Sequence, residues 1–173
     1  EVVFNEPQAA IKEVRFKSYQ FHALPLKHGF LFGDSNLLFK KENGSSDTLT
    51  FVYSDQEKKI TKHFIFANSN YDIWLEINIK NLSASALNVN FPLFLGEIDF
   101  SGNQEEARFK DLTVAGSEKV LHPNAHKEAV FEDVKFLALK DRYFCAIIEP
   151  DNASGYTGFV KRVSPQISEL GLQ

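Results

Sequence analysis

The sequence of 173 residues has no methionine and a single cysteine, Cys145. One cysteine cannot form an internal disulfide, and its position in the apolar run 143–148 predicts a buried thiol rather than a nucleophile. This run falls far short of the roughly 20 apolar residues that cross a bilayer, so no membrane-spanning segment is expected. Glu1 begins directly in strand-like sequence without a basic start or an apolar core, so no signal peptide is expected in this segment. We expect one domain over residues 1–173, truncated at both ends.

A surplus of positive charge is also lacking. Lysine and arginine number 19 against 23 aspartates and glutamates, which gives a net charge of −4. Nucleic-acid binders carry a positive surplus for phosphate contacts, so this class of function is not expected. No GxGxxG, P-loop or GxSxG pattern occurs, and the sequence therefore offers neither a phosphate-binding loop nor a hydrolase nucleophile elbow.

Aromatic residues are abundant, with 17 Phe, 5 Tyr and 1 Trp. They take part in a period-two alternation of apolar and polar residues, which is clearest in segments 48–53, 59–66 and 71–79. Such alternation is typical of half-buried antiparallel strands. Further strands are expected at 86–95, 97–100, 107–112, 119–121, 134–139, 143–149 and 156–160. Turn-forming residues separate the strands at 42–47, 54–57, 68–70 and 81–85.

Helix signals are few, because segments 104–108 and 123–128 are each long enough for a turn of helix only. About a dozen short strands separated by turns predict an all-β fold, a large antiparallel β-sandwich with few short helices.

Candidate contact residues are the aromatic side chains that the predicted core does not account for. Trp74 lies on the polar phase of its strand, together with Glu76. Two aromatic runs bounded by loops, 30–33 and 91–94, have the composition of a groove for an extended apolar segment. The residues that we predict to contact a partner or a peptide are Trp74, Phe30, Phe32, Phe91 and Phe94.

Metal-ligating and catalytic patterns favour structural roles. His122 and His126 have the spacing of zinc ligands on a helix, but Pro123 disfavours a helix through His122 and no cysteine lies nearby. The adjacent carboxylates at 105–106 and 132–133 are interpreted as solvated turns rather than as the acid and base of a glycosidase. No metal site, no cofactor and no catalytic residue is predicted, and no pair of a histidine and a carboxylate can be placed.

The ordered set of strands resembles the large periplasmic domain of YidC, a family of bacterial membrane protein insertases. Segments 47–55, 59–66 and 71–81 resemble consecutive strands of that domain, and Val-Lys-Phe-Leu-Ala-Leu-Lys-Asp-Arg-Tyr-Phe at 134–144 resembles a late signature followed by an apolar strand. The resemblance runs from Phe4 to about Val160. The family usually carries a Gly pair where this chain has Ala-Ala at 9–10.

The resemblance implies a β-supersandwich similar to the galactose mutarotase fold, without enzymatic activity. It implies a domain of an inner-membrane insertase that faces the periplasm and contributes to membrane protein insertion and folding. The implied partners are the translocon accessory subunits SecD and SecF and nascent membrane proteins, which exposed strand edges and aromatic grooves would accept as extended segments. The domain itself is expected to be a soluble monomer.

A second hypothesis belongs to another functional class, because a fold does not bring one activity with it. A sandwich related to the mutarotases would bind or convert carbohydrate. This hypothesis predicts a histidine and a carboxylate that converge in a cleft, with Trp74 as a stacking platform.

Overall fold

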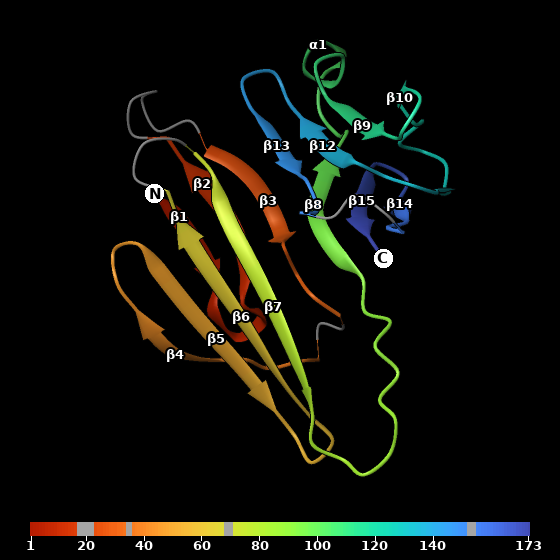
Figure 1. Cartoon of the computed structure of the whole chain (residues 1–173). Coiled ribbons are helices and arrows are strands. Elements are labelled where there is room, and N and C mark those ends of the chain that lie inside the picture. The colour runs from red at the N-terminus through yellow and green to blue at the C-terminus, as the bar shows by residue number, and fades with distance from the viewer. Residues whose placement is uncertain (17–22, 34–35, 68–70, 152–154) are drawn as a thin grey trace.

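A computed structural model describes residues 1–16, 23–33, 36–67, 71–151 and 155–173. Within these residues the chain forms fifteen strands, one short α-helix and one 3-10 helix (Figure 1). Every strand pairing in the described residues is antiparallel, so the prediction of an all-β antiparallel sandwich is confirmed. The turn predicted at 68–70 lies outside the described residues.

The strands form four sheets, named A to D here. Sheet A has the order β1 (Val2–Asn5), β2 (Ala10–Arg15), β3 (Ala23–Gly29), and η1 (Glu6–Gln8) joins β1 to β2. Sheet B has the order β11 (Ala129–Phe131), β14 (Gly158–Ser164), β15 (Ile167–Leu172), β8 (Leu93–Asp99). Sheet C has the order β4 (Lys40–Gly44), β5 (Thr48–Ser54), β6 (Lys58–Phe66), β7 (Ile73–Asn81). Sheet D has the order β10 (Val120–Leu121), β9 (Asp111–Ala115), β12 (Phe136–Lys140), β13 (Cys145–Ile148).

The four sheets pack as two neighbouring pairs, with A and C at one end of the molecule and B and D at the other (Figure 1). Sheet C covers sheet A, because the Phe4 ring on β1 lies 5.5 Å from Phe51 and 5.0 Å from Phe64, between ring centroids. Sheet D covers sheet B at Gly158 on β14, where a Cβ atom would lie only 3.1 Å from the Leu137 side chain on β12. The missing side chain therefore allows the two sheets to approach closely.

The alternation predicted for β5 and β6 places their apolar face in the core. Phe51, Ile60 and Phe64 are completely buried between sheets A and C. Burial of each of these side chains contributes about 1.5 to 3 kcal/mol to folding. Lys62 lies on the same face of β6 and is equally buried, although it carries an amino group.

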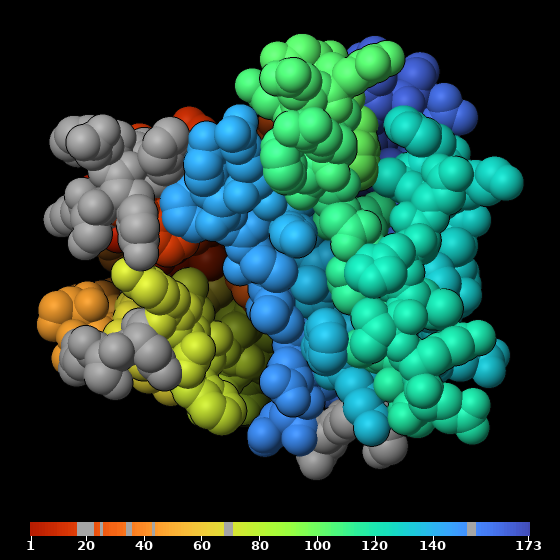
Figure 2. Space-filling model, turned by 90° about the horizontal axis from the view of Figure 1, so that it is seen from above, coloured from red at the N-terminus to blue at the C-terminus, as the bar shows by residue number. Residues whose placement is uncertain are grey.

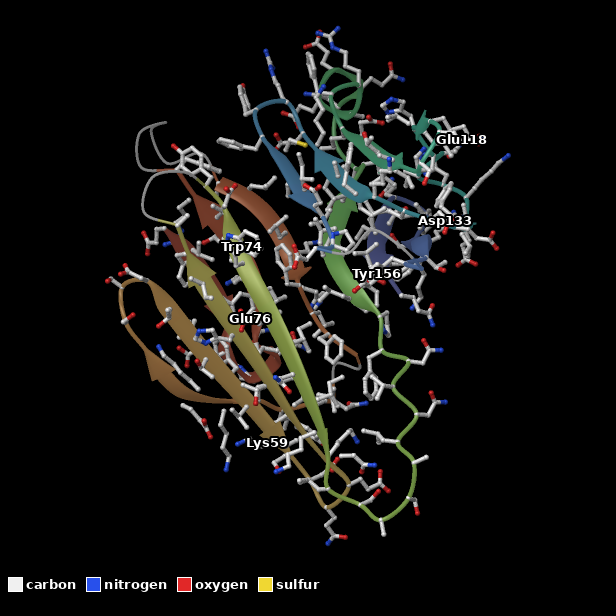
Figure 3. The ribbon with its side chains drawn as sticks, viewed as in Figure 1. Lys59, Trp74, Glu76, Glu118, Asp133 and Tyr156 are labelled. Atoms are coloured by element: carbon white, nitrogen blue, oxygen red, sulfur yellow. The ribbon has the colours of Figure 1, made fainter. Side chains whose placement is uncertain are left out.

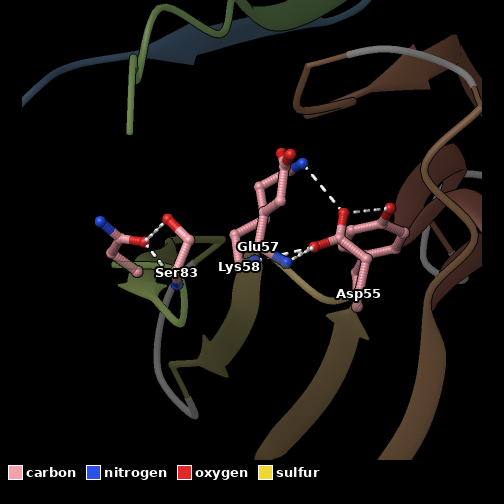
Figure 4. Close-up of polar contacts among 6 residues, drawn as sticks. Asp55, Glu57, Lys58 and Ser83 are labelled. Carbon is pink, nitrogen blue, oxygen red and sulfur yellow. Dashed lines mark hydrogen bonds and ion pairs between the residues drawn. The ribbon is translucent and has the colours of Figure 1, made fainter. Parts of the chain in front are cut away.

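The turn between β5 and β6 is organised by Asp55. Its Oδ1 atom accepts the backbone N–H groups of Glu57 and Lys58, both at 2.8 Å, and its Oδ2 atom accepts the Tyr53 hydroxyl at 2.8 Å and the Lys58 ammonium at 3.0 Å (Figure 4). The bond from Lys58 is the main reason why the pKa of Asp55 lies well below its usual value. The predicted turn at 54–57 thus closes a regular hairpin.

Several predicted bounds differ from the structure. Residues 86–92 form no strand, because asparagines and Pro92 favour turns, and β8 begins only at Leu93. The strand expected at 107–112 begins at Asp111, after α1 (Gln104–Ala107). Residues 123–128 form a turn instead of a helix, and the end of the chain forms β15, which pairs on both sides.

The prediction that Cys145 is buried is wrong. Cys145 is exposed, and along β13 the side chains alternate between the surface and the interior. The reason is that β13 is an edge strand of sheet D with one face toward solvent, so its apolar run is only half-buried. Partial burial still raises the pKa of the Cys145 thiol.

Candidate functional site

The two aromatic runs at 30–33 and 91–94 lie against each other. The amide of Phe30 donates to the carbonyl of Phe94 at 2.7 Å, and the amide of Phe94 donates to Leu31 at 2.9 Å. The rings of Phe32 and Phe91 meet edge to face at 5.5 Å. Phe32 is buried, and the other three aromatic side chains are half-buried. These runs therefore form one unit that joins sheet A to sheet B, and their contact with a partner stays a prediction.

Gly33 allows the two runs to meet. It has a φ of +74°, and a Cβ atom there would lie 3.0 Å from the Leu37 side chain and 3.3 Å from the Phe91 ring. Its amide donates to the Pro92 carbonyl at 2.8 Å. Glycine adopts this left-handed backbone without steric cost, so the turn can close while the chain stays in contact with the second run.

Trp74 lies apart from the two aromatic runs, on the outer face of sheet C. Its side chain is 60% exposed, and its partner in register on β6 is Ile65. The next outward residue of β7 is Glu76, whose partner in register is His63 (Figure 3). The structure thus separates Trp74 from the phenylalanines with which the sequence analysis grouped it, and gives it a histidine and a carboxylate as neighbours.

The outer face of sheet C around these residues is polar and open. The His63 Nδ1 atom lies 2.7 Å from the Thr50 hydroxyl, which orients the ring. Side chains directly opposite on paired strands have Cβ atoms about 5 Å apart, so Glu76 lies within reach of the same ligand as His63. An indole beside hydrogen-bonding side chains is suited to bind a flat, partly apolar molecule. These side chains lie on an open surface that water reaches, and they do not form a closed site.

A charged cluster that the sequence analysis missed joins β3, β8 and β15. Glu97 faces Glu169 in register. Lys27 Nζ and His28 Nε2 lie 3.5 and 3.6 Å from the two carboxylate oxygens of Glu97. Partial burial raises the pKa of Glu169. Lys27 and His28 both have positive φ values, 37° and 52°. These residues are far apart in the sequence, so no local motif signals the cluster.

Lys62 is the second group that the sequence analysis did not single out. Its ammonium donates to the carbonyl of Ala9 and, at 2.5 Å, to the carbonyl of Phe30. It also lies 5.3 Å from the ring centroid of Phe64 and 5.7 Å from that of Phe39. Burial lowers the pKa of Lys62 to about 7. The sequence signal was a lysine on the apolar phase of a strand.

Both carbonyls that Lys62 binds belong to residues with a left-handed backbone. Ala9 has a φ of 46° and Phe30 a φ of 58°. Such conformations are unfavourable for residues other than glycine. Lys62 therefore links sheet C to two turns with left-handed residues, one between β1 and β2 and one after β3.

The two histidines and the adjacent carboxylates that the sequence analysis considered as metal or catalytic patterns do not come together in one site. His122 Nδ1 lies 2.7 Å from Asp111 Oδ2, whereas the His126 ring packs against Phe100 at 5.7 Å. No group of three or more metal-ligating side chains occurs among the described residues. The carboxylates at 132–133 lie with Glu118 around a hollow of about 310 Å³ beside β9 (Figure 3).

Comparison of the chain with protein-family models and with curated proteins finds no match. In the part of the chain that the structure describes, no helix is long and apolar enough to span a membrane. The residues and their geometry are therefore the basis for a functional proposal.

Proposed function

We propose that the chain is a binding domain of a YidC-type membrane protein insertase that acts without catalysing a reaction. In this function it faces the periplasm at the bacterial inner membrane and contributes to membrane protein insertion and folding. Its binding partners are the accessory subunits SecD and SecF or extended segments of substrate chains. Main-chain hydrogen bonds at a strand edge, with pockets for alternate side chains, are a general mode of binding such segments.

The main support is the backbone of Ala9. Its φ of 46° and ψ of 45° lie in the left-handed region, where glycine has no steric cost. This is the position at which the YidC family usually carries its Gly pair. The segments that resemble the family also form consecutive paired strands, β5 to β7 and then β12 with β13. Sequence resemblance and backbone geometry thus favour the same hypothesis.

The peptide-binding part of the proposal is tested by nuclear magnetic resonance. Unfolded apolar peptides are titrated into the isotope-labelled 173-residue chain, and amide shifts confined to one surface are expected. Unchanged spectra at millimolar peptide would contradict binding of substrate chains. The docking part is tested separately by co-purification with the periplasmic domains of SecD and SecF, with an unrelated periplasmic protein as the control.

A second candidate function is carbohydrate binding at Trp74. The specific observation in its favour is that His63, Glu76 and Trp74 share the outer face of sheet C. Titration of monosaccharides and oligosaccharides should change the fluorescence of Trp74, the single tryptophan of the chain, and Glu76→Gln should weaken the effect. A fluorescence signal that no saccharide changes would contradict this candidate.

A further inference from the structure

The free edge of β7 differs from every other sheet edge in the described residues. β7 pairs with β6 alone, and this pairing extends over all nine residues of β7 without a shift in register. The strand β7 contains neither proline nor glycine. A long, regular edge strand presents a row of unpaired N–H and C=O groups to any extended chain that approaches it.

The other edges have features that oppose strand addition. Register shifts interrupt β1 near Val3 and β4 near Lys41. β10, β11 and β13 are only two, three and four residues long. The remaining two edges, β3 and β8, meet just after β3, where the Phe30 amide donates to the Phe94 carbonyl and the Phe94 amide donates to the Leu31 carbonyl. Natural proteins protect their edges by these devices, which makes their absence from β7 informative.

The inward face of β7 is apolar and incompletely covered. Its side chains Ile73, Leu75, Ile77 and Ile79 are each half-buried. On the neighbouring strand β6, the inward residues Ile60 and Phe64 are completely buried because strands lie on both sides of them. A strand added beyond β7 with apolar residues at alternate positions would bury the β7 row in the same way.

The outward face of β7 carries charges that define the complementary sequence. Glu76 and Lys80 are both exposed and lie four residues apart on this face. Opposite charges that face each other across paired strands stabilise the pairing, and like charges oppose it. An antiparallel partner strand should therefore place an acidic residue opposite Lys80 and a basic residue four positions later, opposite Glu76.

The surroundings of β7 favour one strand over a second copy of the chain. Phe16 contacts both Tyr71, just before β7, and Phe144, just before β13, at ring-centroid distances of 5.4 and 4.1 Å. Phe16 lies between these two rings and links the chain just before β7 to the chain just before β13. Figure 2 shows a hollow between the yellow β7 segment and the blue β13 segment. Because β13 lies on the other side of this hollow, the space beside β7 suits a single strand better than the sheet of a second copy.

We propose that the free edge of β7, residues 73–81, binds a single extended peptide in antiparallel orientation, with apolar residues at alternate positions and a basic residue opposite Glu76. The inference rests on the proposed function and specifies where the substrate segment binds. Because backbone groups provide most of the contacts, the edge accepts many apolar sequences, and the charges select among them.

The test uses the probe acetyl-Glu-Val-Thr-Val-Lys-Val-Thr-Val-amide and the isotope-labelled 173-residue chain. The amide shifts caused by the probe should be largest along residues 73–81. Glu76→Lys should weaken binding about threefold to tenfold, and a probe with glutamate in place of its lysine should restore it. Glu118→Lys makes the same change of charge on the far side of the molecule (Figure 3) and should leave affinity unchanged.

Three outcomes would overturn the assignment. Amide shifts centred on 30–33 and 91–94 would move the peptide site to the aromatic runs, while the proposed function stands. Equal loss of affinity in Glu76→Lys and Glu118→Lys would show non-specific attraction. Sedimentation of the free chain as a dimer that Glu76→Lys disrupts would make a second copy the occupant of the edge.

Discussion

Lys62 provides the sharpest prediction about stability, because a charged group at this position is costly to bury. The side chain is completely buried, and its described hydrogen-bond acceptors are the carbonyls of Ala9 and Phe30 rather than a carboxylate. Burial alone lowers the pKa of Lys62, and no neighbouring charge contributes to the shift. The neutral amine keeps two N–H groups for the two carbonyls, so loss of the proton removes the charge without breaking these bonds.

The direction of the pH dependence follows from the lowered pKa. Burial lowers the pKa of Lys62 from 10.5 to about 7. Between these values the unfolded chain binds a proton that the folded chain does not, so the contribution of Lys62 to stability increases with pH. It reaches its full value above the unfolded pKa and is lost as the pH falls through the folded pKa. The slope is about 1.4 kcal/mol per pH unit, or about 2 kcal/mol between pH 8 and pH 9.5.

The measurement compares wild type with Lys62→Met by urea denaturation across this pH range. Subtraction of the two free energies of unfolding removes the titrations that both proteins share, and the difference should grow in favour of wild type by about 2 kcal/mol. Lys80→Met makes the same substitution at an exposed position of β7 and should show no such growth. A difference for Lys62→Met that stays constant, or that falls as the pH rises, would refute the reasoning.

Three further predictions concern the core, a turn and the cysteine. Phe64→Ala should lower the free energy of unfolding by about 3 to 5 kcal/mol in urea denaturation, and a loss below about 1 kcal/mol would contradict complete burial of the ring. Asp55→Asn should destabilise the protein near neutral pH. In thermal melts its difference from wild type should shrink as the pH falls from about 5 to 2, because the charged Asp55 stabilises the fold only above its lowered pKa. A difference independent of pH would argue against the Lys58 bond. Cys145 should react with a thiol reagent in the folded protein, and the reaction should become faster as the pH rises, because the thiolate is the nucleophile and the raised pKa leaves little of it near neutral pH. Reaction only after addition of denaturant would show that the thiol is inaccessible.

Local patterns predicted the strands that are amphipathic over their whole length. β5 to β7 have nearly the expected bounds, because alternating side chains match the two faces of a half-buried sheet. The alternation along β7 also predicted that the Trp74 side chain lies on the outward, polar face of the strand, and this side chain is 60% exposed. The prediction failed at two places: Cys145 lies on an edge strand with one face toward solvent, and residues 86–92, which are rich in asparagine and include Pro92, form no strand.

The candidate sites required contacts between distant parts of the chain. Nothing near His63 in the sequence indicates that Glu76 faces it, because register is set by how two strands align and not by either strand alone. The same holds for Glu97 and Glu169, which are brought together by β8 and β15. Lys62 gave a weak signal as a lysine among apolar residues, but only the turns at Ala9 and Phe30 explain how it is accommodated.

The sequence by itself determined the fold class, the direction in which each regular strand faces, and the absence of any excess of positive charge. These properties depend on composition and on a two-residue period, both of which are local. The tertiary structure decided that the runs at 30–33 and 91–94 meet, that Lys62 is enclosed, and that β7 pairs with β6 alone among the described strands. Those features depend on which strands become neighbours, and that choice is made by the packing of the whole core rather than by any single segment.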